Sequence, residues 1–169
     1  MARIILLSLY IKKLIKLRLL INFISVIVLL LIFEFGFNPL WDYLYEIFDI
    51  KKTSFYGNEK TAFFLFSIII IAPIVETLVF QVLIKYLLDF TSLRSIQNKI
   101  IYYSIISGVL FGLTHNYSIV HIIKATIMGV IFMLFYLKTL NKKKLMITII
   151  YISTTHAFWN LFVWFCRNI

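Results

Sequence analysis

Four polar side chains lie inside long apolar stretches of this 169-residue chain. Glu76 belongs to the run TAFFLFSIIIIAPIVETLVF, His115 follows GVLFGLT, and His156 precedes Asn160 by about one helical turn. An ionisable side chain at the centre of a bilayer costs about 2.5–3.5 kcal/mol, so such residues usually face a partner or a water-filled cavity. We therefore take Glu76, His115, His156 and Asn160 as the candidate catalytic residues.

These residue types could together hydrolyse a peptide bond. Glu76 could act as general base on a water molecule that His115 holds in place. His156 and Asn160 could donate hydrogen bonds to the oxyanion of the tetrahedral intermediate, and one such donor contributes about 2.7–4 kcal/mol in known enzymes. Equally, Glu76, His115 and His156 could ligate zinc and leave a fourth position open for water. The spacing does not separate the two mechanisms, so no metal or other cofactor is assigned.

The composition places these residues in a membrane. The chain is 62% hydrophobic with a mean hydropathy of +0.98, whereas soluble domains are about 45–50% apolar. A spanning helix needs about 20 apolar residues, and five segments approach this length: 19–37, 61–88, 100–115, 119–140 and 145–165. The sequence predicts an all-α, polytopic transmembrane helical bundle of about five spans in one membrane domain, residues 1–169. Residues 1–18 are expected to form an amphipathic segment at the interface.

The distribution of charge predicts the orientation. A net charge of +10 does not indicate nucleic-acid binding here, because the basic residues lie between apolar runs rather than on one face of a soluble fold. Twelve Lys and Arg residues fall in the loops on one side of the predicted spans and four on the other. Since Lys and Arg favour cytoplasmic loops, we expect a multi-pass protein of the cell membrane with a cytoplasmic N-terminus and an external C-terminus. Its partners are then the lipid bilayer and a peptide or membrane-protein substrate, and no feature indicates an oligomeric state.

Several residues predict how the spans are shaped and packed. Pro73 lacks a backbone donor, so a kink is expected at this point of the second span. Gly108 and Gly129 favour close packing of the third and fourth spans, which a short turn joins into a helical hairpin. Lys124 is expected to extend its ammonium group to the membrane surface, and Glu34 to lie at the interface.

The three titratable candidates do not lie at one depth along ideal helices. Counted from the basic loops on the predicted inner side, Glu76, His156 and His115 lie 9, 12 and 16 residues deep. At about 1.5 Å per residue, these depths differ by roughly 10 Å. A shared site therefore requires that the third span tilts or that the turn after it dips into the protein.

Three segments, taken in order, resemble the signatures of a known family. They are APIVETLVFQ at 72–81, FGLTH at 111–115 and HAFWN at 156–160. The sequence resembles the CAAX prenyl protease and bacteriocin-processing family, also called Abi or CPBP, over residues 60–165. Glu76 matches the first glutamate of that family's first signature, His115 the histidine of the second, and His156 with Asn160 the third.

The resemblance implies an α-helical intramembrane endopeptidase. In such a protein the first glutamate and the second-signature histidine activate water, and the third-signature pair stabilises the oxyanion. The family has also been described as metal-dependent, so the resemblance leaves the choice between water activation and zinc open. Two positions depart from the first signature, because Thr77 stands where the family has a second glutamate and Gln81 where it has an arginine.

Non-enzymatic functions are the alternatives. Asn and His inside membranes often only bond helices together, and the departures at Thr77 and Gln81 would suit a bacteriocin immunity protein or a regulatory membrane protein of the same fold. A small transporter or channel fits less well, because the polar residues converge and no inverted repeat is visible.

Overall fold

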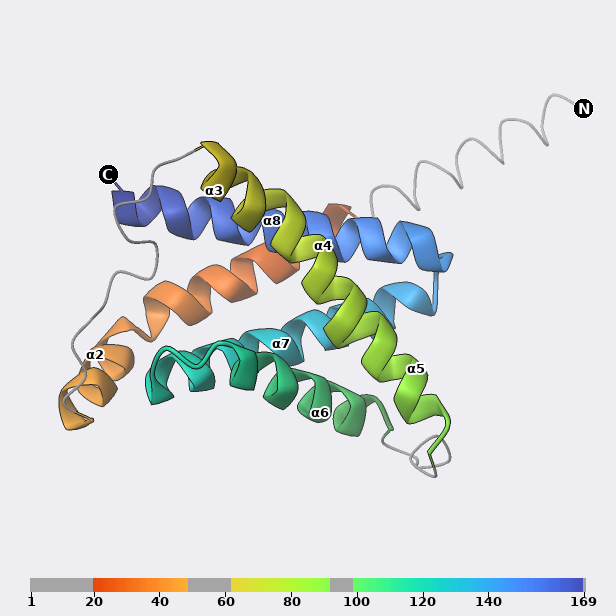
Figure 1. Cartoon of the computed structure of the whole chain (residues 1–169), viewed down its shortest axis with the longest axis horizontal. Helices are drawn as coiled ribbons and strands as arrows, with labels where there is room; N and C mark the ends of the chain where they lie inside the picture. The colour runs from red at the N-terminus through yellow and green to blue at the C-terminus, as the bar shows by residue number, and fades with distance from the viewer. Residues whose placement is uncertain (1–19, 49–61, 92–98, 169) are drawn as a thin grey trace, which may run out of the picture.

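Every regular element that the structure describes is a helix. The computed structural model describes residues 20–48, 62–91 and 99–168, and within these ranges it contains no strand. The helices are Leu20–Gly36, α2 (Asn38–Ile47), the continuous helix Ala62–Asp89, α6 (Lys99–Thr114), α7 (Ile119–Leu140) and α8 (Leu145–Asn168) (Figure 1). The all-α prediction is confirmed. The interfacial segment predicted at 1–18 lies outside the described residues.

The long helices have the length and composition of membrane spans. Three of the described helices qualify individually, namely Ala62–Asp89, Ile119–Leu140 and Leu145–Cys166. Leu20–Gly36 and α2, which meet at a bend of 48°, qualify together as a fourth. α6 has 16 residues, a length of about 24 Å, and is apolar but shorter than the usual span. The molecule is therefore a membrane-embedded helical bundle, while the five-span count and the orientation stay predictions.

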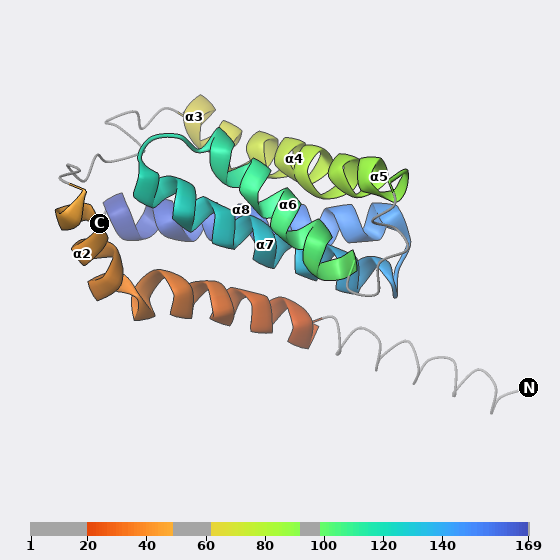
Figure 2. The same cartoon turned by 90° about the horizontal axis from the view of Figure 1, so that it is seen from below.

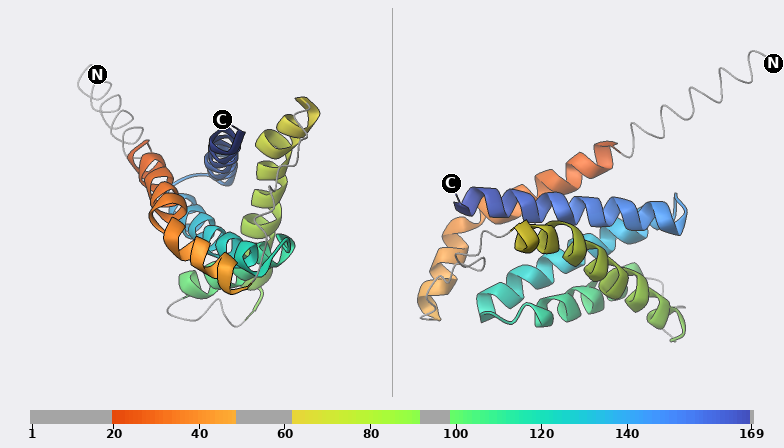
Figure 3. Two further views of the ribbon diagram at one scale, coloured as in Figure 1. Left: turned by 90° about the vertical axis from the view of Figure 1, so that its left-hand side faces the viewer. Right: turned by 45° about the horizontal axis from the view of Figure 1, so that its top comes forward.

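The helix Ala62–Asp89 contains α3 (Ala62–Phe66), α4 (Ala72–Glu76) and α5 (Ile84–Asp89), joined by two π-helical segments. The first, Ser67–Ile71, ends at the residue before Ala72, and Pro73 follows Ala72. The proline ring would collide with the carbonyl four residues earlier in a regular helix, and a wider π turn relieves this crowding. The distortion predicted at Pro73 thus takes the form of a wide turn, and α3 leans away from the rest of the helix (Figure 3, left).

Glycines bring α6 and α7 into backbone contact. A Cβ atom on Gly108 would lie 2.7 Å from the Thr126 carbonyl oxygen, and one on Gly129 would lie 2.9 Å from the Gly108 Cα. The close packing predicted for Gly108 and Gly129 is confirmed, because no larger residue fits these contacts without a backbone shift. Gly112, which the sequence did not single out, is equally tight, since its Cβ would lie 2.7 Å from the Ile122 carbonyl oxygen.

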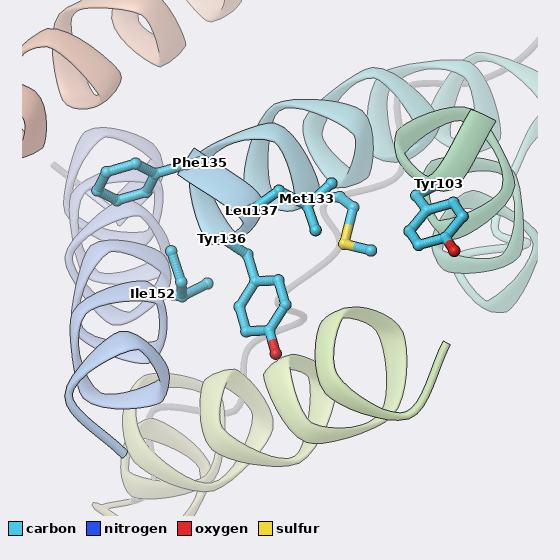
Figure 4. Packing of buried hydrophobic residues seen from close by; sticks show 6 residues of the cluster. All are labelled: Tyr103, Met133, Phe135, Tyr136, Leu137 and Ile152. Carbon is cyan, nitrogen blue, oxygen red and sulfur yellow. The ribbon is translucent and has the colours of Figure 1, made fainter. Parts of the chain in front are cut away.

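Apolar clusters join the hairpin to the other helices. One combines Tyr103 of α6 with Ile152 of α8 around a group of α7 side chains: Met133, Phe135, Tyr136 and Leu137 (Figure 4). A second cluster places Leu30 against Phe132 and Trp159. The helix Leu20–Gly36 is therefore docked along α7 and α8 and forms part of the bundle (Figure 2).

Candidate active site

All four predicted residues line one cavity of about 560 Å³. Glu76 comes from the helix Ala62–Asp89, His115 from the turn after α6, and His156 and Asn160 from α8. Helix Ala62–Asp89 crosses α8 obliquely (Figure 1), and α6 ends one residue before His115. Oblique crossing and the position of the α6–α7 turn thus bring together residues whose depths along ideal helices would differ.

Glu76 and His156 lie side by side in this cavity. The His156 Nε2 is 3.4 Å from the Glu76 Oε2, yet this oxygen is buried and accepts no hydrogen bond from any described residue. Buried polar atoms are nearly always hydrogen-bonded, and exceptions are often found where a water molecule or a reacting group belongs. The Glu76 carboxylate therefore has a free acceptor site beside an imidazole, at a cavity wall.

Two phenylalanines hold the His156 ring. The imidazole is only 4% exposed, and its centroid lies 4.6 Å from that of Phe132 and 5.9 Å from that of Phe111. Phe111 also contacts the His115 ring, with 4.4 Å between centroids, and its Cβ lies 2.9 Å from the position that a Cβ on Gly129 would occupy. The glycine contact between α6 and α7 therefore positions Phe111, which in turn packs against both histidines.

The backbone selects the tautomer of His115. Its Nδ1 lies 2.9 Å from the Phe111 carbonyl oxygen, and because a carbonyl can only accept, Nδ1 carries the proton. The Phe111 carbonyl belongs to the last turn of α6, where helical carbonyls lack a backbone partner. The Nε2 of neutral His115 then keeps its lone pair, which can accept a proton or a hydrogen bond from water.

Asn160 binds a carbonyl that Pro73 leaves unpaired. Its Nδ2 donates to the Ile68 carbonyl oxygen at 2.8 Å. In the wide turn the Ala72 N–H bonds Ser67 rather than Ile68, and the next backbone nitrogen belongs to Pro73, which has no hydrogen. Asn160 thus fixes α8 to the distorted turn with one N–H of its amide. The second N–H of this amide can donate another hydrogen bond.

The two residues that depart from the family signature are buried in the bundle. Thr77 is 0% and Gln81 2% exposed, and neither lines the cavity. The Thr77 hydroxyl oxygen has no hydrogen-bond partner in the part of the chain that the structure describes. The interior around these two positions therefore contains uncharged polar groups where the family signature has a glutamate and an arginine.

The cavity also contains an ion pair that the sequence did not predict. Lys124 Nζ lies 2.8 Å from the Glu34 carboxylate, and the two side chains are 12% and 14% exposed. The ammonium also lies 5.4 Å from the centre of the Trp41 ring. Lys124 and Glu34 are thus largely buried and pair with each other, whereas neither was predicted from the sequence to have a protein partner. The sequence signal that could have predicted this ion pair is that Glu34 and Lys124 are each an isolated charged residue in an apolar stretch.

The zinc alternative lacks a preformed set of ligands. Within residues 20–48, 62–91 and 99–168, no three His, Cys, Asp or Glu side chains are arranged to hold a metal ion. Glu76, His115 and His156 share the cavity without forming such a group.

Comparison with known proteins identifies the family. No curated protein and no solved structure matches the chain. The model of the type II CAAX prenyl endopeptidase Rce1-like family matches residues 58–162. This range covers more than half of the chain and includes all four candidate residues, and it agrees with the order of the three sequence signatures. The chain therefore belongs to the type II CAAX prenyl endopeptidase Rce1-like family.

Proposed function

We propose that this protein is an intramembrane endopeptidase that cleaves a peptide or a membrane-associated protein by means of activated water. One observation carries the proposal: the Glu76 Oε2 is buried without a hydrogen bond, 3.4 Å from His156, in a cavity that His115 also lines. Membership of an endopeptidase family supports it. A non-enzymatic immunity or regulatory role would not explain why this buried carboxylate oxygen is left without a hydrogen bond.

Glu76 and His115 act on the water. A water molecule between them donates one hydrogen bond to the Glu76 carboxylate and one to the His115 Nε2, whose lone pair is free. As the water oxygen attacks the scissile carbonyl carbon, Glu76 takes the proton and acts as general base. The tetrahedral intermediate then collapses, the carbon–nitrogen bond breaks, and Glu76 returns the proton to the leaving amine. The products are a new carboxylate and a new amine.

His156 and Asn160 stabilise the oxyanion. His156 is fixed by its contacts with the Phe111 and Phe132 rings, so a hydrogen bond from its ring needs little reorganisation as charge develops. Asn160 uses one amide N–H on Ile68 and has a second one to donate. Its bond to Ile68 holds the amide in place, which makes it a positioned donor.

The substrate is an apolar segment. The cavity walls include Val75, Val79, Met128 and Val163 next to the polar residues. An extended peptide with apolar side chains would bury them against these walls, at about 25 cal/mol per Å² of apolar surface. A strongly charged segment would lose its hydration without finding partners. We therefore expect cleavage within or next to a hydrophobic stretch.

The test compares new peptide N-termini in membranes that contain the wild type or Glu76→Gln. Wild-type membranes should show a set of new N-termini, and their peptides, incubated with purified enzyme in ¹⁸O-labelled water, should take up one ¹⁸O in the new carboxylate. Glu76→Gln should lower the cleavage rate about 10²- to 10⁴-fold, because an amide cannot act as general base.

Glu46→Gln is the matched control, since Glu46 is exposed on α2 and does not line the cavity. It should cleave like the wild type, and all three proteins should unfold at similar temperatures in detergent. The same set of new N-termini from wild type and Glu76→Gln would refute the proposal.

A further inference from the structure

A second cavity, of about 280 Å³, lies at the end of the bundle where α5 ends, α6 begins and α7 ends. It shares no lining residue with the cavity that contains Glu76. Its lining combines polar groups, chiefly Lys85, Lys99 and Asn141, with apolar groups, chiefly Ile100 and Leu137. It is therefore amphiphilic, and the proposed hydrolysis does not use it.

The acid in this cavity already has partners. Asp89 forms an ion pair with Lys85, and the Tyr103 hydroxyl donates to its other carboxylate oxygen at 3.0 Å. Tyr103 is only 2% exposed, so this contact fixes the end of the helix Ala62–Asp89 to α6. With Asp89 neutralised by Lys85, the charge that the cavity offers a ligand is the positive charge of Lys99, and the Asn141 amide also lines the cavity.

The surroundings add further positive charge. The α7–α8 turn, which Asn141 begins, continues with Lys142, Lys143 and Lys144, and Lys138 lies one turn earlier on α7. Within the described ranges, Asp89 is the only acidic residue near these lysines in the chain or in the cavity lining. The charge around this site therefore favours an anionic ligand.

An apolar stripe continues from the cavity along the outside of α6. Ile100 lines the cavity and is 44% exposed, and Ile101, Ile105 and Val109, spaced four residues apart, are 53%, 49% and 41% exposed. In a membrane-embedded bundle these side chains face lipid. A ligand with its charge in the cavity and an acyl chain beside this stripe would satisfy both surfaces, which a soluble anion would not.

We propose that this cavity binds the phosphodiester headgroup of an anionic phospholipid. Lys99 and Asn141 contact the phosphate, and the acyl chains follow the exposed face of α6. The site holds α5, α6 and α7 together at the bundle end opposite the α6–α7 turn, and its occupancy stabilises the folded protein by mass action.

The test measures thermal unfolding of the purified full chain in a neutral detergent with added phosphatidylglycerol or phosphatidylcholine of the same acyl chains. Phosphatidylglycerol should raise the unfolding temperature at concentrations where phosphatidylcholine does not. Lys99→Gln, at an exposed position, should weaken the apparent affinity for phosphatidylglycerol about fivefold, the usual effect of one lysine near an anionic lipid surface.

Lys144→Gln is the matched control, because it removes the same charge nearby without changing the cavity lining. An equal loss in Lys144→Gln and Lys99→Gln would show diffuse attraction and overturn the proposal. Equal stabilisation by the two lipids, or by glycerol phosphate at the same concentration as phosphatidylglycerol, would also overturn it, the last by identifying a soluble anion as the ligand.

Discussion

The bond between Asn160 and the Ile68 carbonyl predicts an energetic coupling between α8 and Pro73. Asn160→Ala removes the donor and leaves a carbonyl oxygen unpaired in an apolar interior. An unpaired buried acceptor costs about 1–3 kcal/mol, although hydrogen bonds between membrane helices average about 0.6 kcal/mol and reach about 1.7. For a direct bond of 2.8 Å, we expect a loss of about 1 kcal/mol in the free energy of unfolding.

Pro73→Ala should remove most of this cost. It supplies an N–H at position 73 and lets the wide turn return to α-helical bonding, in which Ala72 would donate to Ile68. Either donor pairs the carbonyl without Asn160. Asn160→Ala should therefore cost about 1 kcal/mol in the wild type and close to nothing in the Pro73→Ala background. The volume lost with the proline ring affects both arms of the cycle equally.

The assay is reversible unfolding of the four proteins in mixed micelles of increasing SDS content. Thr155→Ala is the matched control, because Thr155 is also buried on α8 but donates within its own helix, to Tyr151 at 2.8 Å. It should show the same cost in both backgrounds. Additive effects of Pro73→Ala and Asn160→Ala, within about 0.3 kcal/mol, would refute the idea that the proline frees the carbonyl that Asn160 binds.

Two further predictions concern packing and charge. Gly129→Ala should destabilise the protein by about 1–3 kcal/mol through overpacking of α6 on α7. Gly36→Ala is the control and should not, since its Cβ would lie at an ordinary 3.6 Å from the Ile32 side chain. SDS unfolding measures both variants, and equal effects would contradict the close contact of Gly129 with α6. Lys124→Met should cost about 3 kcal/mol because it removes the cation that pairs with the largely buried Glu34 carboxylate. Adding Glu34→Gln should recover most of this loss, and a double variant as unstable as Lys124→Met would argue against the pair.

The helices could be predicted from the sequence because lipid constrains them strongly. A span must be apolar for about 20 residues, so the ends of the apolar runs mark the ends of the helices: the predicted 61–88 and 119–140 became Ala62–Asp89 and Ile119–Leu140. Helix crossing is not encoded in length. It depends on contacts such as that of Gly129 with the Gly108 backbone. The sequence shows which residues could make such a contact but not the angle at which the helices cross.

The candidate site was predictable as a set of residues but not as a set of contacts. Polar residues isolated in apolar runs identified Glu76, His115, His156 and Asn160, and all four line one cavity. The partner of Asn160 is the Ile68 backbone carbonyl. This carbonyl lacks a helical partner because of the π turn, which cannot be predicted from the residue types. The proposed anionic lipid site could not be predicted from the sequence either, because Lys99 and Asn141 are 42 positions apart in the chain and each resembles an ordinary loop residue.

The shortness of α6 has a consequence for the supply of water. Its 16 residues cover about 24 Å, whereas the hydrocarbon layer of a bilayer is about 30 Å thick. A bilayer adapts to a short helix by thinning beside it, which brings headgroups and their hydration closer to the end of α6 at Thr114. His115 stands immediately after that end, so the hydrophobic mismatch of one helix would deliver the water that a hydrolase consumes, without a channel through the protein.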